Sequence, residues 1–286
     1  MKYGLVAHRL HRLGADCSLL RWARHCEADL NTLALDLHAT GGAHDALLIN
    51  DLLRSRLISV GHGRDGGLMR LVSRAAGGLT PDAAIDGVFF FVDPVNPTSM
   101  YPEAQALKRQ CVIHGKPFVA TLAGAIEWVG VEMACAGMVA SSVPEGKKLP
   151  APESQVLALI AHDALKSDML AFAVEHFDML SRFAGRVATG TTGSQLNAMA
   201  WSRGWPASRP WVTCYQSGPL GGDAQIAELV LDRRCQKVIF FEDPHVARQH
   251  EADIQLLERA VYSAGDVTTC FNTPAMTRRW AQAVGN

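Results

Sequence analysis

The chain contains a second, divergent copy of its own sequence, and this repeat constrains the fold more than any other feature. The repeated segments are "GLVAHRLHR" (4–12) with "ALIAHDALK" (158–166), "HATGGAHDAL" (38–47) with "VATGTTGSQL" (187–196), and "VFFFVDPVN" (88–96) with "VIFFEDPHV" (238–246). The offset is 154 residues between His8 and His162 and 149 between Thr40 and Thr189. Because the offset drifts so little, the sequence predicts two similar domains in tandem rather than a short-repeat solenoid.

Each copy alternates short apolar runs with longer helical patterns. In the second copy the apolar runs are "VLALIA" (156–161), "RVATG" (186–190), "KVIFF" (237–241) and "DVTTCF" (266–271). A strand followed by a helix, repeated, predicts an α/β fold in which a parallel sheet carries helices on both faces. Ligands of such sheets bind beyond the carboxyl ends of the strands, so the loops that follow strands are where a site is expected.

A proline-rich segment separates the two copies. Residues 140–155 read "ASSVPEGKKLPAPESQ", and three prolines among small and charged residues exclude a regular element there. We therefore predict a domain over 1–139, a linker over 140–155 and a second domain over 156–286. A chain of 286 residues is long enough for two domains of ordinary size.

The composition limits which binding partners and which cellular compartment are expected for the chain. Lys and Arg number 27 against 28 Asp and Glu, so neither a basic surface for nucleic acid nor an acidic tail is expected. The seven cysteines are scattered without a CxxC pair, which indicates reduced thiols rather than zinc ligands. The N-terminus lacks the apolar run of a signal peptide, and no stretch reaches the roughly 18 apolar residues of a membrane span. We expect a cytoplasmic protein with a small-molecule or protein partner, and neither nucleic acid nor membrane.

The first candidate loop, "AHDALK", follows the apolar run 156–161. His162 and Lys166 are four residues apart at the start of a helix, a spacing that points both in the same direction, with Asp163 between them. The alternative is that Asp163 caps the helix while His162 packs in the core and Lys166 is solvated.

The second loop, "ATGTTG", is typical of a phosphate cradle. Residues 189–193 are expected to join a strand to a helix that begins near Ser194. Backbone N–H groups beside glycines, three threonine hydroxyls and the helix dipole together suit a phosphate dianion. The loop is neither a Walker A motif nor a G-x-G-x-x-G fingerprint, so a nucleotide is not implied. The alternative is a polar turn with a capping threonine.

The third loop, "SGPLGGDAQI" (217–226), places one carboxylate behind three glycines. Gly218, Gly221 and Gly222 allow the backbone to pass close to a ligand, and Asp223 lies where the turn meets the following helix. The alternative is that Asp223 is only the N-cap of that helix.

The fourth loop, "EDPHVARQHEADIQLLER" (242–259), carries two histidines and several acids. This composition invites a zinc hypothesis, but His245 and His250 stand in a proline-containing loop at a spacing unusual for zinc, and no cysteine joins them. We therefore expect no metal. A carboxylate base and a neutral imidazole facing a phosphate cradle instead indicate proton transfer on a sugar phosphate.

These four loops, in this order, resemble those of methylglyoxal synthase. The matching residues are "ALIAHDALK", "VATGTTG", "SGPLGGDAQI" and "IFFEDP" with His250, Asp253 and Arg259, over about 120 residues of the second copy. The resemblance implies a five-stranded parallel sheet in each domain, a homo-oligomer and no cofactor. It also implies a carbon–oxygen lyase that converts dihydroxyacetone phosphate to methylglyoxal and inorganic phosphate.

The resemblance also implies a role for each matching residue. Asp223 would remove a carbon-bound proton, and His250, supported by Asp253, would polarise the carbonyl and move protons among the oxygens. His162 and Asp163 would line the same pocket as part of the catalytic group. The residues that would hold the phosphate are Lys166, Thr189, Gly190, Thr191, Thr192, Ser217 and Gly218.

The first copy keeps the apolar runs but not these side chains. Arg9 and Arg12 replace the aspartate and the lysine of the first loop, and Asp65 is the base displaced by about one residue. Met100 and Glu103 take the places of His250 and Asp253. We therefore predict one catalytic site per chain, and three chains that together imitate a hexamer.

Two further expectations depend on the resemblance. Family members continue with a segment whose arginine reaches a neighbouring active site, a role that Arg278 or Arg279 is expected to take here. The alternative function is a non-catalytic sensor of the same fold that binds a phosphate or another anion as an effector. A sensor would need the phosphate cradle but not Asp223, His250 and Asp253 together.

Overall fold

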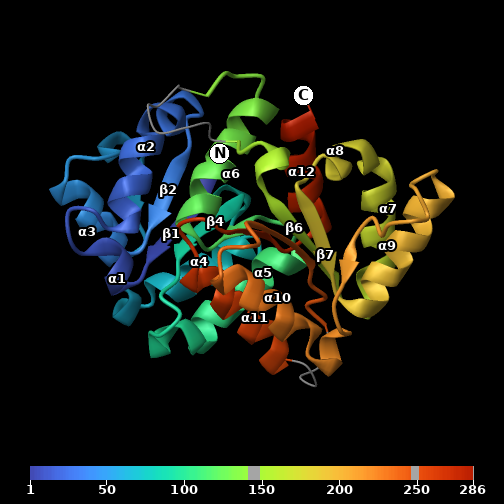
Figure 1. Cartoon of the computed structure of the whole chain (residues 1–286). Helices are drawn as coiled ribbons and strands as arrows, with labels where there is room; N and C mark the ends of the chain where they lie inside the picture. The colour runs from blue at the N-terminus through green and yellow to red at the C-terminus, as the bar shows by residue number, and fades with distance from the viewer. Residues whose placement is uncertain (141–148, 246–250, 286) are drawn as a thin grey trace. The chain divides into compact units, whose positions relative to one another are not determined.

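The computed structural model describes residues 1–140, 149–245 and 251–285, with the main chain alone for residues 251–254 (Figure 1). The chain divides into two compact units, Met1–Leu149 and Pro150–Asn286. Each unit contains one five-stranded sheet in which all neighbouring strands are parallel. The predicted fold, two tandem α/β domains with a parallel five-stranded sheet each, is therefore confirmed.

The N-terminal unit contains strands β1–β5 and helices α1–α6. The strands are β1 (Lys2–Ala7), β2 (Asp36–Ala39), β3 (Leu57–Ser59), β4 (Gly87–Phe91) and β5 (Phe118–Val119). The helices are α1 (Arg9–Arg12), α2 (Ser18–Thr32), α3 (Gly41–Ile49), α4 (Gly67–Ala75), α5 (Pro102–Ile113) and α6 (Leu122–Cys135), with 3-10 turns η1 (Arg54–Arg56), η2 (Gly63–Asp65), η3 (Pro81–Ala83) and η4 (Pro97–Met100).

The C-terminal unit contains strands β6–β10 and helices α7–α12. The strands are β6 (Val156–Ala161), β7 (Gly185–Ala188), β8 (Thr213–Cys214), β9 (Lys237–Phe241) and β10 (Thr269–Phe271). The helices are α7 (Lys166–Glu175), α8 (Phe177–Ser181), α9 (Gly190–Ser202), α10 (Gly222–Leu231), α11 (Glu251–Ser263) and α12 (Pro274–Gly285), with 3-10 turns η5 (Pro152–Ser154), η6 (Asp163–Leu165) and η7 (Gly218–Leu220).

The two sheets have the same topology. The strand order is β3-β2-β1-β4-β5 in the first unit and, read in the same direction, β8-β7-β6-β9-β10 in the second. In both units the chain leaves the central strand toward one edge and later returns to the opposite edge. Such a reversal leaves a crevice at the carboxyl end of the central strand, which is where a ligand is expected.

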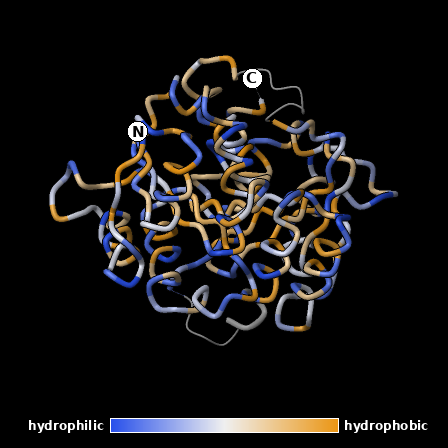
Figure 2. Tube along the Cα trace, turned by 90° about the vertical axis from the view of Figure 1, so that its left-hand side faces the viewer, coloured by the Kyte–Doolittle hydropathy of each residue, from blue (hydrophilic) through white to orange (hydrophobic). Residues whose placement is uncertain are grey.

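Alternate residues of the central strands face opposite layers of helices. In the C-terminal unit Ala158 and Ile160 of β6 belong to the apolar core beneath α10 and α11, as do Val238 and Phe240 of β9. The Phe241 ring instead meets Phe172 of α7, with 6.0 Å between ring centroids. Figure 2 shows apolar stretches concentrated in the interior and polar ones toward the periphery. Burial on both faces explains why these strands read as continuous apolar runs.

The predicted boundaries differ from the structure in three places. The helix expected near Ser194 begins at Gly190, so the cradle threonines lie in its first turn. The run 266–271 forms a strand only over Thr269–Phe271. Residues Pro152–Ser154 form a 3-10 turn where no regular element is expected, because proline suits the first position of a helical turn. The linker over 140–155 stays a prediction, since residues 141–148 lie outside the described part.

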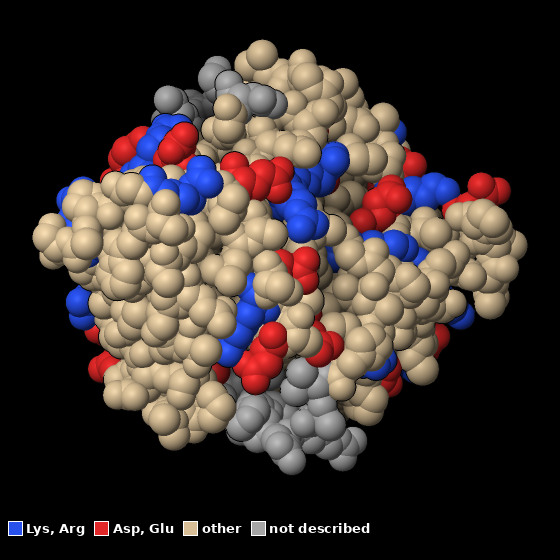
Figure 3. Space-filling model, turned by 90° about the vertical axis from the view of Figure 1, so that its right-hand side faces the viewer, with Lys and Arg blue, Asp and Glu red and all other residues tan. Residues whose placement is uncertain are grey.

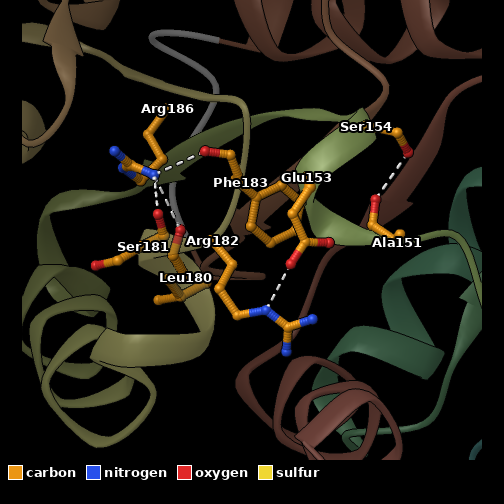
Figure 4. A network of polar contacts seen from close by, with 8 residues as sticks. All are labelled: Ala151, Glu153, Ser154, Leu180, Ser181, Arg182, Phe183 and Arg186. Atoms are coloured by element: carbon orange, nitrogen blue, oxygen red, sulfur yellow. Dashed lines mark hydrogen bonds and ion pairs between the residues drawn. The ribbon is translucent and has the colours of Figure 1, made fainter.

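The strand β7 is tied to the preceding helix α8 by one arginine (Figure 4). The Nη1 atom of Arg186 donates to the carbonyl oxygens of Leu180, Ser181 and Phe183, at 3.2, 3.1 and 3.0 Å. Its Nε atom donates to the carbonyl of Trp211 at 2.7 Å. An arginine that binds the last carbonyls of a helix satisfies acceptors that the helix leaves open. This contact fixes the strand that leads into the threonine loop.

Figure 3 shows basic and acidic side chains interspersed on the face in view. All seven cysteines are free, and burial raises the pKa of Cys111 and of Cys235 to about 12. Within the described ranges, no helix combines the length and the apolar character that crossing a bilayer requires.

Candidate active site

A pocket of about 480 Å³ lies in the crevice of the C-terminal unit, beyond the carboxyl end of β6. Its lining residues are Ile160, Ala161, His162, Asp163, Lys166, Thr189, Thr191, Thr192, Ser217, Gly218, Pro219, Asp223 and Phe240. Nine of the twelve predicted site residues are among them, drawn from the first three candidate loops. The size is within the usual range for sites of small molecules.

Three predicted residues are not part of this lining. Gly190 lies at the start of α9, where its N–H donates to the carbonyl of Gln216 at 2.9 Å. His250 lies outside the described residues, and so does the side chain of Asp253. The contribution of the fourth loop to the pocket therefore stays a prediction.

The N-terminus of α9 forms one wall of the pocket. Thr189 occupies the N-cap position with an extended backbone, but its side chain makes no capping hydrogen bond. A threonine therefore occupies the cap position, as the alternative for this loop expects, but its hydroxyl makes no capping bond. The first turn of a helix offers backbone N–H groups that have no intrahelical acceptor, and here that turn contains Thr191 and Thr192. The wall is thus electropositive and rich in donors.

The hydroxyl of Thr192 is a further polar group at this wall. The residue is 2% exposed, and its Oγ1 atom has no hydrogen-bond partner among the described residues. A buried hydroxyl without a partner costs free energy on the order of 1–3 kcal/mol, which a bound oxyanion would recover. This observation favours an anionic ligand over an apolar one.

Lys166 supplies the positive charge of the pocket. Its side chain is 20% exposed, and its Nζ atom lies 2.5 Å from Oδ1 of Asp163, whose carboxylate is 95% exposed. Because the N-cap positions of η6 and α7 are His162 and Leu165, Asp163 does not cap the helix, and that alternative is wrong. Lys166 is held at the pocket by a partner in the same turn rather than being freely solvated.

Asp223 also lines the pocket, from the first turn of α10. The N-cap of α10 is Gly221, which has a φ of +95°, so Asp223 is not the capping residue. Its Oδ1 atom is buried, and a Cβ placed on Gly218 would approach Oδ2 to 2.9 Å. The glycine is needed because any larger residue at position 218 would press on this carboxylate.

His162 connects the ends of the two central strands. Its Nδ1 atom accepts the main-chain N–H of Asp243, which follows β9, at 2.8 Å. The ring stands edge-on to Phe240, with 4.9 Å between centroids and 82° between planes. The sequence predicts His162 at the site but not this contact or the apolar lining by Phe240 and Ile160, because positions within apolar strands give no sign of facing a ligand.

No metal cluster is found in the described part of the chain, where no three His, Cys, Asp or Glu side chains are grouped as ligands. His245 is exposed, and its N–H donates to Oδ1 of Asp243 at 2.8 Å.

Arg278 lies near His176. Burial is the largest cause of the lowered pKa of that imidazole, and the positive charge of Arg278 lowers it further. The role expected of Arg278 or Arg279 in a neighbouring active site stays a prediction.

The corresponding region of the N-terminal unit is built differently. Leu68 is the second residue of α4, which is the position that Asp223 holds in α10. Asp65 is therefore displaced from the position of the base by three residues, and the predicted displacement of about one residue is wrong. Gly42 and Ala43 replace the cradle threonines, and a Cβ on Gly42 would meet the Arg12 guanidinium carbon at 2.7 Å. The arginine side chain therefore lies against the start of α3.

Fold and pocket together define a doubly wound α/β protein whose crevice is lined by a lysine, threonines and an aspartate. A methylglyoxal synthase of Thermus thermophilus is 43% identical over 105 residues, which cover 37% of this chain and 76% of that protein. The enzymes of Rhizobium etli and Clostridium beijerinckii are 43% and 39% identical over 106 and 103 residues, covering 78% and 79% of their lengths and 37% and 36% of this chain. The chain belongs to the methylglyoxal synthase family.

Two other comparisons complete the picture. A crystal structure of methylglyoxal synthase from Elizabethkingia anophelis NUHP1 aligns with 44% of this chain and 76% of its own, at 32% identity and a TM-score of 0.36. No protein-family model matches the chain.

Proposed function

We propose that the C-terminal unit is a methylglyoxal synthase, a carbon–oxygen lyase that converts dihydroxyacetone phosphate to methylglyoxal and inorganic phosphate. The observation that carries the proposal is the pocket itself, in which Asp223, a lysine and the first turn of a helix line one volume of about 480 Å³. The relatives are named for this activity, and they match about 37% of the chain. A phosphorylated triose is small enough to place its phosphate at α9 and its reacting carbon at Asp223.

The proposed reaction begins with proton removal. Asp223 takes a proton from the hydroxyl-bearing carbon next to the carbonyl, and the electron pair moves onto the carbonyl oxygen to give an enediolate. A proton then moves from the former hydroxyl oxygen to the former carbonyl oxygen. The electron pair left on the former hydroxyl oxygen forms an aldehyde C=O and the C=C pair shifts to the phosphate-bearing carbon. The bond from that carbon to the phosphate oxygen breaks, and its electron pair leaves with the phosphate. The remaining enol takes up a proton on carbon and becomes methylglyoxal.

The phosphate group would be held by charge and by hydrogen-bond donors. Lys166 contributes a charge-assisted bond, and the first turn of α9 contributes N–H groups together with the buried hydroxyl of Thr192. Thr189, Gly190, Thr191, Ser217 and Gly218 complete the proposed phosphate site. His250 and Asp253 are proposed to polarise the carbonyl and move protons on the strength of the resemblance alone.

The N-terminal unit is proposed to contribute structure rather than catalysis. Leu68 stands where the base would be, and Arg12 lies where a cradle threonine would be. The His8 Nε2 atom already lies 3.3 Å from Oγ1 of Thr98. With one catalytic unit per chain, we propose a homo-oligomer in which three chains supply the six domains of a hexamer-like assembly.

The test measures both products. Purified protein is incubated with dihydroxyacetone phosphate, and inorganic phosphate and trapped methylglyoxal are assayed, with Asp223→Asn as the control. Equal amounts of both products, lost in the control, are expected. Formation of glyceraldehyde 3-phosphate without phosphate release would indicate an isomerase. Phosphate binding without turnover would indicate the non-catalytic effector-binding alternative.

A further inference from the structure

His162 is fixed through its Nδ1 ring nitrogen and its main chain. The Nδ1 atom accepts the N–H of Asp243 at 2.8 Å, and the N–H of His162 itself donates to the carbonyl of Phe241 at 3.1 Å. Because β6 and β9 are neighbouring parallel strands, these two bonds hold the histidine across both strand ends. The ring packs edge-on against Phe240, which limits its rotation.

The side chain of Asp243 shapes the turn that makes this contact. Its Oδ1 atom accepts the N–H of His245 at 2.8 Å, which closes a turn around Pro244. An aspartate that bonds the backbone two residues ahead holds such a turn in place. The main-chain N–H of Asp243 is thereby aimed at His162 by the carboxylate of the same residue.

The contact determines where the imidazole carries its proton. A neutral histidine has one donor and one acceptor nitrogen, and in imidazolium both nitrogens are donors. Since Nδ1 accepts an N–H, it cannot itself be protonated without placing two N–H groups against each other. The proton of the neutral ring therefore sits on Nε2.

The N-terminal unit repeats the same arrangement. The Nδ1 atom of His8 accepts the N–H of Asp93 at 2.9 Å, and Oδ1 of Asp93 accepts the N–H of Val95 at 3.0 Å. The His8 ring stands edge-on to Phe90, with 5.0 Å between centroids. The pKa of His8 is lowered to about 4, chiefly by burial and further by His11 and Arg12, against an opposing effect of Asp93. The two units thus share the histidine, the aspartate turn and the edge-on phenylalanine.

We propose that Asp243 is a positioning residue, whose turn fixes His162 as a neutral imidazole that presents its Nε2–H to an oxygen of the bound substrate. The inference rests on the proposed function for the identity of that substrate. It predicts that the carboxylate of Asp243 acts through His162 and needs no contact with the reacting atoms.

The experiment reads the proton position directly. Nitrogen-15 NMR of histidine-labelled protein without ligand reports whether Nδ1 or Nε2 carries the proton, and His162→Gln assigns the signal among the 11 histidines. In Asp243→Ala, we expect a mixture of both forms at His162 and a fall in kcat of about tenfold, equivalent to about 1.4 kcal/mol. Asp243→Asn retains the accepting oxygen, so it should restore the wild-type signal and most of the turnover.

A matched control and a second variant separate this role from a loss of folding. Asp93→Ala removes the same turn in the N-terminal unit and should alter the His8 signal while leaving kcat unchanged. His245→Pro keeps the Asp243 carboxylate but removes the N–H that it accepts, and should reproduce the effect of Asp243→Ala. Thermal unfolding of each variant is measured alongside.

Two results would overturn the inference. One is a wild-type His162 signal in both Asp243→Ala and His245→Pro. The other is a displaced signal with unchanged turnover. Because the NMR measurement uses no substrate, a wild-type protein without synthase activity would refute the proposed function while still testing the position of the proton.

Discussion

Replacing Gly218 by alanine should disturb the carboxylate of Asp223 and little else. Gly218 has no positive φ, so its backbone conformation is open to alanine. The new Cβ would lie 2.9 Å from Oδ2 of Asp223 and no closer than 3.6 Å to any other atom outside the neighbouring residues. The clash is therefore directed at one flexible side chain.

The size of the effect follows from the distance. Ordinary van der Waals contact of a Cβ begins at 3.4 Å, so the carboxylate must retreat by about 0.5 Å. Displacement of a reacting group by about 1 Å can lower a rate by about 10²-fold. We expect Gly218→Ala to lower kcat by about tenfold, with a smaller change in KM because the main-chain N–H at position 218 remains.

The assay compares phosphate release and thermal unfolding for two matched variants. Gly63 opens η2 as Gly218 opens η7, and a Cβ at Gly63 would meet nothing within 4 Å. Gly63→Ala should therefore retain full activity. If Gly218→Ala is as active as Gly63→Ala, with a similar melting temperature, the carboxylate is not the group whose position limits the rate.

Three further predictions test the proposed site. Asp223→Asn should retain phosphate binding but lower turnover by about 10²–10⁴-fold, as expected for loss of a general base, and full activity in a clean preparation would exclude that role. Lys166→Met should weaken inhibition by inorganic phosphate by about ten- to a hundredfold, because one charge-assisted hydrogen bond is lost; unchanged inhibition would place the lysine outside the site. Calorimetric titration with phosphoglycolate should give one tight site per chain, lost on changing Thr191 or His250 and retained on changing Arg9 or Arg12. Two equivalent tight sites would show that the N-terminal unit also binds substrate-like anions.

The central strands can be predicted to the residue because burial on both faces requires continuous apolar sequence. The runs 156–161 and 237–241 coincide with β6 and β9. The edge strand β8 is not predicted, since it has two exposed residues and depends on pairing with β7 for its conformation. Short edge strands leave little trace in a hydrophobic pattern.

The start of α9 shows why part of the site cannot be predicted from local sequence. Glycine and threonine are poor helix formers, so the sequence predicts a loop over residues 190–193. In the structure the neighbouring loop fixes this turn: Gly190 donates to Gln216, and a Cβ on Gly190 would lie 3.0 Å from the nitrogen of Ser217. Thr189 stands at the N-cap, but the helix start it marks in the sequence lies within a run of glycine and threonine that is also typical of a loop.

The N-terminal unit separates what the fold requires from what the proposed chemistry requires. The histidine, its accepting nitrogen and the aspartate turn are present in both units with nearly the same distances, so this frame forms with or without the base and the full set of threonines. The base and two of the three cradle threonines are absent, whereas Thr40 keeps the place of Thr189. Arg12 lies against Gly42, so a threonine restored at position 42 would collide with the guanidinium, and a lysine restored at position 12 would leave no cradle hydroxyl. A domain that had merely lost its function would accumulate changes independently of one another. Matched changes over an intact frame are the pattern that the proposed structural role of this unit predicts.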